Sequence, residues 1–180
     1  MTDVLIVSDT HGKRERLERL ISYRQKQLRS GDVLNLIFLG DGLVDLYSCS
    51  RYGEIITHAV RGNCDFGVPF GPFGEDIPET AVITLGGYRI FVSHGHTLDV
   101  KSTRARLYEA AAAADADIAL FGHTHAPLEE YITNERVRSL KKPLAVFNPG
   151  SLGDFSGSFG NLSISDNGFL LSFGKYDNIK

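Results

Sequence analysis

The segment Asp117-Ile118-Ala119-Leu120-Phe121-Gly122-His123-Thr124-His125 joins a short apolar run to two histidines that are two residues apart. The apolar run has the composition of a strand that is buried on both faces. Pro127 follows almost at once, so the chain cannot form a helix directly after the histidines. Two imidazoles at the exposed end of a buried strand are placed to bind a metal ion. By itself, a histidine pair at this spacing is equally compatible with an ordinary loop.

The remaining histidines favour a metal site. The chain contains 6 His, and His58 alone lies outside short clusters of histidine, glycine and acidic residues. The clustered histidines are His11, His94, His96, His123 and His125. Chance would not distribute the histidines in this way, so we interpret the clusters as parts of one functional site.

Length and composition are those of an ordinary globular protein. A chain of 180 residues can bury a sizeable core, and we expect residues 1–180 to form a single domain. The net charge of -3 gives no basic surface for tight binding of nucleic acid or anionic membranes. The N-terminus lacks a signal-peptide pattern, and no apolar run is long enough to span a bilayer. The 2 Cys residues, Cys49 and Cys64, do not suggest a disulfide framework, so we expect a cytoplasmic protein.

Apolar runs and helical patterns alternate in the first third of the chain. This alternation predicts parallel strands that are connected by right-handed crossovers. The expected strands are residues 4–7, 33–39 and 55–60, and the expected helices are residues 13–28 and 44–50.

The rest of the chain has a different pattern. Residues 66–78 are rich in Gly, Pro and Phe and lack periodicity, so we expect a loop there. A Gly86-Gly87 turn predicts a hairpin, and the Ala-rich residues 102–114 predict a helix. The further expected strands are residues 80–85, 88–93, 117–121, 128–133, 144–147, 162–165 and 169–173. We therefore predict an α/β first part followed by a mostly antiparallel β part.

Polar residues follow five of the expected strands. They are Asp9 with His11, Asp41, Asn63 with Cys64 and Asp65, His94 with His96, and His123 with His125. In an open α/β sheet, ligands bind at the carboxyl ends of the strands, so these side chains are expected to converge on one site. Their mixed oxygen and nitrogen donors suit Mn, Fe, Zn or similar divalent ions. The donors are too many for one tetrahedral ion, and two ions about 3.5–4 Å apart that share a carboxylate fit better.

Each cluster also has an ordinary structural interpretation. Asp9 and His11 could be a helix cap and a loop histidine. Asp41 and Asn63 could be turn residues, and His94 with His96 could be a histidine pair without a ligand. The clusters are weak evidence singly, but their common place at strand ends favours a metal site.

The ordered motifs resemble those of the calcineurin-like metallophosphoesterases, and more narrowly those of the small bacterial and archaeal YfcE-type phosphodiesterases. The matching motifs are Asp9-Thr10-His11, Gly40-Asp41, Gly62-Asn63-Cys64-Asp65, His94-Gly95-His96, Gly122-His123-Thr124-His125 and Asn148-Pro149-Gly150-Ser151. The resemblance runs from Val4 to about Ser151. It implies an α/β (α+β) fold, a four-layer α-β-β-α sandwich of two mixed sheets with a dinuclear site at one edge.

The resemblance also implies the metal ligands. One ion would be bound by Asp9, His11, Asp41 and His125, and the other by Asp41, Asn63, His94 and His123. Mn is the expected ion, with Fe, Zn, Ni and Mg as alternatives.

Cys64 is a departure from the wider superfamily, in which many members have His at this position. The narrower branch commonly has Cys there. In the wider superfamily Asp65 would orient that His, so here we place Asp65 beside the ligands rather than on the ions. Asp45 and Arg61 could also lie beside the ligands, but solvated charges are the favoured interpretation of both. We expect Asn63, Cys64, Asp65 and His96 to contribute to catalysis, with His96 as a partial substitute for the missing proton donor.

The predicted function is a metal-dependent phosphodiesterase that acts on a small-molecule phosphodiester. Two cations would bind the phosphate oxygens and a bridging hydroxide, which would attack phosphorus in line with the leaving group. A thiol cannot carry the positive charge that helps to bind a dianionic monoester, so diesters should be preferred over monoesters.

Other functions remain open. The same fold serves as a non-catalytic scaffold in a retromer subunit, which resembles this family but has lost a metal-binding histidine. A phosphatase or nuclease of the same superfamily is a further alternative, although the net charge of -3 disfavours a nuclease. The loop from Phe66 to Gly74 carries three Phe residues that would line a substrate cleft, form a homo-oligomer interface, or pack against the protein's own sheet.

Overall fold

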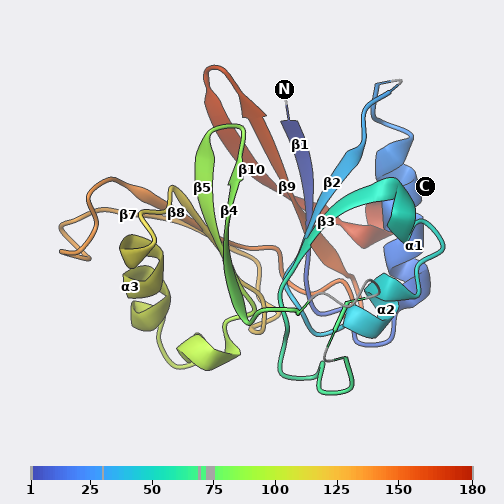
Figure 1. Ribbon diagram of the computed structural model, residues 1–180, viewed down its shortest axis with the longest axis horizontal. Coiled ribbons are helices and arrows are strands. Elements are labelled where there is room, and N and C mark those ends of the chain that lie inside the picture. The colour runs from blue at the N-terminus through green and yellow to red at the C-terminus, as the bar shows by residue number, and fades with distance from the viewer. Residues whose placement is uncertain (1, 30, 69, 72–75, 180) are drawn as a thin grey trace.

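Two five-stranded sheets pack face to face and are covered by helices on both outer faces (Figure 1). The structure is a computed structural model that describes residues 2–29, 31–68, 70–71 and 76–179. The first sheet has the order β10-β9-β1-β2-β3, and the second has the order β4-β5-β6-β8-β7. Helices α1 (Arg14–Gln25) and α2 (Leu43–Tyr47) lie on one side of the sheets, and α3 (Ala105–Ala113) lies on the other (Figure 1). This is the expected four-layer α-β-β-α sandwich.

The strands of the first sheet come from both ends of the chain. They are β1 (Thr2–Val7), β2 (Leu34–Phe38), β3 (Ile55–Ala59), β9 (Ser158–Ser165) and β10 (Gly168–Lys175). β1, β2 and β3 are parallel, as the alternation of strands and helices predicts. β9 and β10 form an antiparallel hairpin that returns from the end of the chain to pair with the other edge of β1.

The second sheet is also mixed. It contains β4 (Thr80–Leu85), β5 (Tyr88–Ser93), β6 (Ile118–Leu120), β7 (Leu128–Ile132) and β8 (Leu144–Asn148). β4 and β5 form the expected hairpin, and β7 pairs antiparallel with β8. β8, in contrast, pairs parallel with β6, so the expectation of a mostly antiparallel second part fails for this strand. Three short 3-10 helices, Tyr52–Glu54, His96–Leu98 and Tyr176–Asn178, complete the structure.

Three clusters of buried side chains separate the four layers. The first lies between the first sheet and helices α1 and α2, the second lies between the two sheets, and the third lies between the second sheet and α3. Leu5 and Val7 of β1 belong to the first cluster, whereas Val4 and Ile6 belong to the second. Alternate residues of β1 are therefore buried on opposite faces, which explains why its sequence is an uninterrupted apolar run.

The helices are shorter than their sequence patterns predict. Residues 13–28 predict one helix, but α1 ends at Gln25, and Lys26, Gln27 and Leu28 continue in turns. Among the described residues, no helix is long and apolar enough to cross a membrane.

Candidate metal centre

Loops from both sheets meet at the ends of five strands. β1, β2 and β3 lead into the loops that carry Asp9, Asp41 and Asn63, and β5 and β6 lead into those that carry His94 and His123. The Asp9 N–H donates to the Gly40 carbonyl over 3.0 Å, which joins the first two loops. The His123 N–H donates to Oδ2 of Asp9 over 3.1 Å, which joins the two sheets. The loops are therefore held together by backbone N–H groups that donate to a carbonyl and to the Asp9 carboxylate.

The backbone of these loops is strained. Among the described residues, seven that are not glycine have positive φ, and five of these seven are candidate ligands. The five are Asp9 (φ 55°), His11 (φ 44°), Asp41 (φ 57°), His123 (φ 65°) and His125 (φ 59°). A left-handed conformation is unfavourable for residues with a side chain and is found mainly where surrounding contacts impose it, often at functional sites. Gly62 allows a close approach of two loops, because a Cβ there would lie 2.1 Å from Oδ1 of Asp41.

The first group of donors consists of Asp9, His11 and His125. Oδ1 of Asp9 lies 3.1 Å from Nε2 of His125 and 3.6 Å from Nε2 of His11, and the two Nε2 atoms are 3.2 Å apart. This oxygen is buried and has no hydrogen-bond donor among the described residues. The other carboxylate oxygen is occupied by the Ser8 hydroxyl and by the His123 N–H. A divalent cation would satisfy the buried oxygen and both ring nitrogens at once.

The second group consists of Asp41, His94 and His123. Nε2 of His94 lies 3.4 Å from Oδ2 of Asp41 and 3.2 Å from Oδ1 of Asn63. The Nδ1–H of His94 donates to the Leu39 carbonyl over 2.7 Å. This bond leaves the lone pair of Nε2 to face the other donors, as a metal ligand requires.

Asp41 lies between the two groups. Its Oδ2 is 3.4 Å from Nε2 of His94 and 3.9 Å from Nε2 of His11. Its Oδ1 accepts the Cys64 N–H over 2.7 Å, which fixes the orientation of the carboxylate. Asp41 is thus the carboxylate that faces histidines of both groups.

At Asp41 and His123 the local electrostatics favour the forms that bind cations. At His94, burial alone would lower the pKa, but the nearby carboxylates of Asp41 and Asp9 outweigh burial and raise it. Burial opposes the ionisation of Asp41, but its contacts with His94 and with the Cys64 N–H hold its pKa well below its usual range. Burial, assisted by the nearby His94, lowers the pKa of His123 to about 4. At neutral pH the site therefore presents an ionised carboxylate and a neutral imidazole, which are the forms that coordinate metal.

Asp65 organises the loop that carries Asp41. Its buried carboxylate accepts the backbone N–H groups of Asp41, Gly42, Leu43 and Gly62, each over 2.8–2.9 Å. Both oxygens of Asp65 accept these hydrogen bonds from the backbone. Asp65 therefore acts on the expected ligands indirectly, by holding the loops that carry them.

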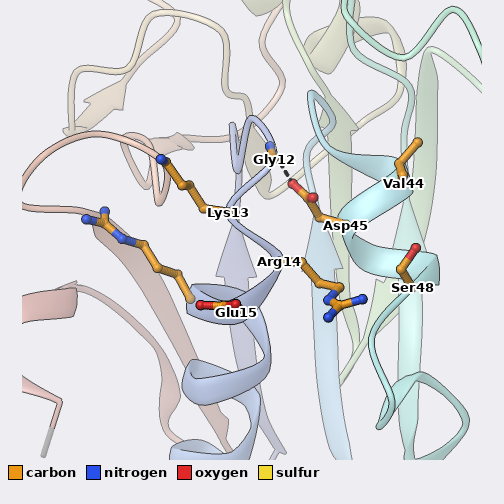
Figure 2. A pocket seen from close by; sticks show the side chains of 8 residues that line it. Gly12, Lys13, Arg14, Glu15, Val44, Asp45 and Ser48 are labelled. Atoms are coloured by element: carbon orange, nitrogen blue, oxygen red, sulfur yellow. Dashed lines mark hydrogen bonds between the residues drawn. The ribbon is translucent and has the colours of Figure 1, made fainter.

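Asp45 lies beside the first motif and is buried, so the interpretation of it as a solvated charge is wrong. Its carboxylate accepts the Thr10 hydroxyl over 2.5 Å and the Gly12 N–H over 2.8 Å, the bond that Figure 2 shows. The Nε of Arg61 donates to the Ile77 carbonyl over 3.5 Å.

Cys64 and His96 lie at the border of the site. The Cys64 thiol is exposed, and partial desolvation together with Asp41 raises its pKa to about 11. The His96 ring lies 5.4 Å from the His94 ring and 6.2 Å from the His123 ring, measured between centroids. Burial and His94 lower the pKa of His96. Both side chains border the donor groups. Among the described residues, Cys64 also forms a third group of possible metal donors with His11 and Asp41, whereas His96 belongs to none of the groups.

Two further residues complete the surroundings of the site. Asn148 donates from Nδ2 to the Gly122 carbonyl over 2.8 Å and to the Thr124 hydroxyl over 3.1 Å, which supports the loop of the two histidines. Asn148 begins the motif Asn148-Pro149-Gly150-Ser151, which is one of the motifs that carry the family resemblance. Asp154 accepts the Nδ1–H of His125 over 3.1 Å. Nothing in the sequence near Asp154 indicates this contact, because the two residues are 29 positions apart.

The loop after the third motif is described in part. Phe66 is 87% exposed and Phe70 is 58% exposed, so neither packs against the protein's own sheet. Val68 packs against the first core cluster instead. Phe73 and Gly74 lie outside the described residues.

A cavity of about 600 Å³ adjoins the site (Figure 2). It begins at Gly12, directly after the candidate ligand His11, and none of its lining residues is a candidate ligand. The lining residues are Gly12, Lys13, Arg14, Glu15, Arg16, Val44, Asp45 and Ser48. The side chain of Arg14 lies between α1 and α2, as Figure 2 shows. Three basic residues, Lys13, Arg14 and Arg16, therefore line this cavity.

Solved structures share the whole fold. A conserved protein from Streptococcus pneumoniae TIGR4, described as a predicted phosphoesterase, has a TM-score of 0.73 and 25% identity over 98% of this chain and 90% of that chain. Vacuolar protein sorting 29 from Cryptosporidium parvum has a TM-score of 0.67 and 17% identity over 97% of each chain. A protein described as a novel archaeal phosphodiesterase has a TM-score of 0.64 and 17% identity over 96% of this chain and 99% of that chain. At such low identities, the last two establish similarity of fold alone.

The sequence comparisons identify the family. A Bacillus subtilis (strain 168) protein named probable metallophosphoesterase YsnB is 30% identical over 151 residues, which are 83% of this chain and 75% of the relative. The family model for the calcineurin-like phosphoesterase superfamily domain matches residues 2–165. With the fold and the ordered motifs, these matches show that the chain belongs to the calcineurin-like phosphoesterase superfamily.

Proposed function

We propose that this protein is a metal-dependent phosphodiesterase with a dinuclear site. The observation that carries the proposal is the pair of donor groups, Asp9 with His11 and His125, and Asp41 with His94 and His123, joined through Asp41. The family supports a phosphoesterase that uses divalent metal ions. Two groups that meet at one carboxylate are the arrangement that a shared, bridged pair of ions needs.

The candidate ligands would bind the two ions as two sets that share Asp41. Asp9, His11, Asp41 and His125 would hold one ion, and Asp41, Asn63, His94 and His123 would hold the other. When bound, the two ions neutralise the charge of the phosphate and supply a hydroxide nucleophile at neutral pH. The buried Oδ1 of Asp9, which has no hydrogen-bond partner among the described residues, supports a cation at the first group, because an unpartnered carboxylate oxygen is costly to bury.

The other residues position the ligands and shape the charge of the site. Asp65 holds the backbone that carries Asp41, and Asn63 keeps its carbonyl oxygen 3.2 Å from Nε2 of His94. Cys64 presents a neutral thiol beside Asp41. His96, at the border of the second group, is the imidazole placed to assist the leaving group.

The neutral thiol of Cys64 favours diesters over monoesters. A phosphodiester carries one negative charge, whereas a monoester near pH 7 is mostly dianionic and gains more from a cationic group. A solved relative in fold is described as an archaeal phosphodiesterase, which supports this choice. The cavity of about 600 Å³ beside His11 is where the larger substituent of a small-molecule diester would lie.

The remaining features of the proposal follow from the donor chemistry and the composition. Mn is the proposed ion, with Fe, Zn, Ni and Mg as alternatives for the same oxygen and nitrogen donors. We place the protein in the cytoplasm. We also infer that the exposed Phe66 and Phe70 either contact substrate or form a homo-oligomer interface.

The test is a comparison of two substrates on one preparation. Metal content is measured on the purified protein, and kcat/KM is then measured with bis-p-nitrophenyl phosphate and with p-nitrophenyl phosphate in the presence of Mn²⁺. We expect two ions per chain and a clear preference for the diester. Equal kcat/KM values for the two substrates would remove the reason to choose a diesterase over a general phosphatase.

A non-catalytic scaffold is the second candidate, since vacuolar protein sorting 29 has the same fold. The complete set of candidate ligands in this chain favours the enzyme. A protein that binds two ions yet hydrolyses neither a diester nor a monoester would favour the scaffold.

A further inference from the structure

One candidate ligand is held in place by a carboxylate that the family motifs do not include. The Nδ1–H of His125 donates to Oδ1 of Asp154 over 3.1 Å, and Nε2 of the same ring lies 3.1 Å from Oδ1 of Asp9. A histidine that donates Nδ1–H presents its other nitrogen as a lone pair, in a fixed orientation. A carboxylate partner also raises the basicity of the ring, which strengthens a metal bond.

The segment that carries Asp154 is attached to the first motif through its backbone. The Leu152 N–H donates to the Ser8 carbonyl over 3.0 Å, and the Gly153 N–H donates to the Asp9 carbonyl over 2.9 Å. The Ser151 hydroxyl also donates to the Asp9 carbonyl over 2.9 Å. Residue 153 must be small, because a Cβ there would lie 2.7 Å from the carbonyl oxygen of Thr10. These contacts do not involve the Asp154 side chain, so the segment keeps its place when that side chain is replaced.

Arg16 of α1 holds the other side of this segment. Its guanidinium donates to the carbonyls of Leu152 over 3.0 Å and Phe155 over 3.2 Å, and also to the carbonyl of Asp154. The guanidinium lies over the ring of Tyr176, 5.0 Å from its centroid. Three carbonyls bound by one planar guanidinium leave the segment little freedom, and Asp154 is therefore presented to His125 from a fixed backbone.

The second donor group is supported differently. The Nδ1–H of His94 donates to a backbone carbonyl, that of Leu39, over 2.7 Å, and the ring is fully buried. The ring of His125 is about one third exposed, and its partner Asp154 is half exposed. Among the described residues, a carboxylate that accepts the Nδ1–H of a candidate ligand is therefore found in the group of Asp9, His11 and His125 alone.

We propose that Asp154 is a positioning residue for His125. It sets the affinity of the first donor group for a divalent ion and leaves the affinity of the second group unchanged. The inference rests on the proposed metal centre. Loss of a carboxylate that orients a ligand histidine typically weakens metal binding about 10- to 100-fold. Replacing Asp154 should therefore weaken ion binding by the first donor group and not by the second.

The test measures Mn²⁺ binding, so it does not depend on turnover. The first background is His123→Ala, which weakens ion binding by the second donor group. There, Asp154→Ala should raise the Kd of the remaining ion about 10- to 100-fold. The second background is His11→Ala, which weakens the first group. There, the same substitution should leave the Kd unchanged. Isothermal titration calorimetry gives both values, and thermal unfolding with chelator present checks that each variant is folded.

Two matched variants separate positioning from a general disturbance of the segment. Asp154→Asn keeps an oxygen that accepts the Nδ1–H, so it should recover most of the affinity. Phe155→Ala changes the neighbouring residue, which is 96% exposed, and should leave the Kd of both ions at the wild-type value. The inference would be overturned if Asp154→Ala raised the Kd for Mn²⁺ equally in both backgrounds or in neither. It would also be overturned if Asp154→Asn raised the Kd as much as Asp154→Ala.

A readout without added ion separates this inference from the proposed function. In the ¹⁵N chemical shifts of the imidazoles, wild-type His125 should be the Nδ1–H form, and Asp154→Ala should shift it toward the other form. A wild-type protein that binds no Mn²⁺ would overturn both the metal centre and the proposed affinity effect. A protein that binds two ions and shows no effect of Asp154→Ala would overturn the inference alone.

Discussion

Asp41 makes two different kinds of contact with its two carboxylate oxygens. Oδ1 is held by the Cys64 N–H at 2.7 Å, whereas Oδ2 faces Nε2 of His94 at 3.4 Å and Nε2 of His11 at 3.9 Å. One oxygen therefore fixes the side chain and the other joins the donor groups. An amide at this position keeps the first contact and loses the charge between the groups.

The first prediction is that Asp41→Asn loses metal and turnover together. The variant should bind fewer than two ions per chain, and kcat should fall by about 100-fold or more, because a charged shared ligand becomes a neutral one. Metal analysis and steady-state kinetics on the same preparation measure both effects. The fold should persist, since the amide oxygen still accepts the Cys64 N–H. Two bound ions with unchanged activity would show that our assignment of the shared ligand is wrong.

The second prediction concerns Cys64, whose thiol is the neutral group at the border of the site. Cys64→His should raise kcat/KM for p-nitrophenyl phosphate by about 10-fold or more, because an imidazole donates a proton and carries positive charge toward a dianion. The diester rate should change less, so the gap between the substrates narrows. Cys64→Ser is the matched control, because it is neutral and small and should leave the monoester rate low. An unchanged ratio in Cys64→His would contradict our account of the diester preference.

At the scale of elements, helix α3 is joined to strand β7 by a charged cluster away from the site. Glu130 of β7 accepts the Tyr108 hydroxyl over 2.5 Å, Nε of Arg104 over 2.8 Å and Nη1 of Arg136 over 3.2 Å. Burial alone would raise the pKa of Glu130, but these hydrogen bonds and charges outweigh burial and lower it. The folded state therefore favours the ionised form of Glu130.

The third prediction is a pH dependence of stability that depends on Glu130. A carboxyl group whose pKa is lowered by folding stabilises the protein above its unfolded-state value of about 4.3, and this contribution disappears as the pH falls through the lower folded-state pKa. At pH 7, Glu130→Gln should lower the free energy of unfolding by about 1–2 kcal/mol. The difference should shrink toward zero as the pH falls below about 4. Urea unfolding of wild type and variant across this range measures it.

Glu129→Gln is the control for this prediction, because Glu129 lies next to Glu130 and is exposed. Its difference from wild type should be small at every pH. A Glu130→Gln difference that stays constant down to pH 3 would mean that the charge of Glu130 does not contribute to stability.

At the scale of the whole molecule, the candidate site lies where loops of the two sheets contact each other. The His123 N–H donates to Asp9, and His94 contacts Asp41. Each of these contacts connects a residue that follows a strand of the second sheet to a residue that follows a strand of the first sheet. Ions held by both sets of loops would add bonds between the sheets. Metal binding should therefore stabilise the entire fold and not the loops alone.

The fourth prediction is that removing metal lowers the melting temperature. An ion present at 100 times its Kd stabilises the folded state by about 2.7 kcal/mol, which in a chain of this size corresponds to about 5–10 °C. Differential scanning calorimetry with and without EDTA measures the shift. The Asp41→Asn variant should show a smaller shift, since it should hold less metal. Equal melting temperatures of the wild-type protein with and without EDTA would argue that the folded chain does not bind ions.

The sequence by itself determined the elements and the order of the motifs. Local patterns suffice for these, because an apolar run such as Val4–Val7 reports burial on both faces, and a polar residue after such a run marks the end of a strand. The family resemblance added the four-layer arrangement and the candidate ligands. Each of these inferences depends on residues that are close together in the chain.

The tertiary structure decided which distant segments became neighbours. The sequence did not indicate that β9 pairs with β1 or that β8 runs parallel to β6, because strand pairing depends on complementary faces and not on local composition. For the same reason, it gave no sign of Asp154 beside His125, since a backbone segment attached to Asp9 and held by Arg16 brings the two together. Hydrogen bonds between residues more than a hundred positions apart have no local signature, and they appear only once the two sheets have packed.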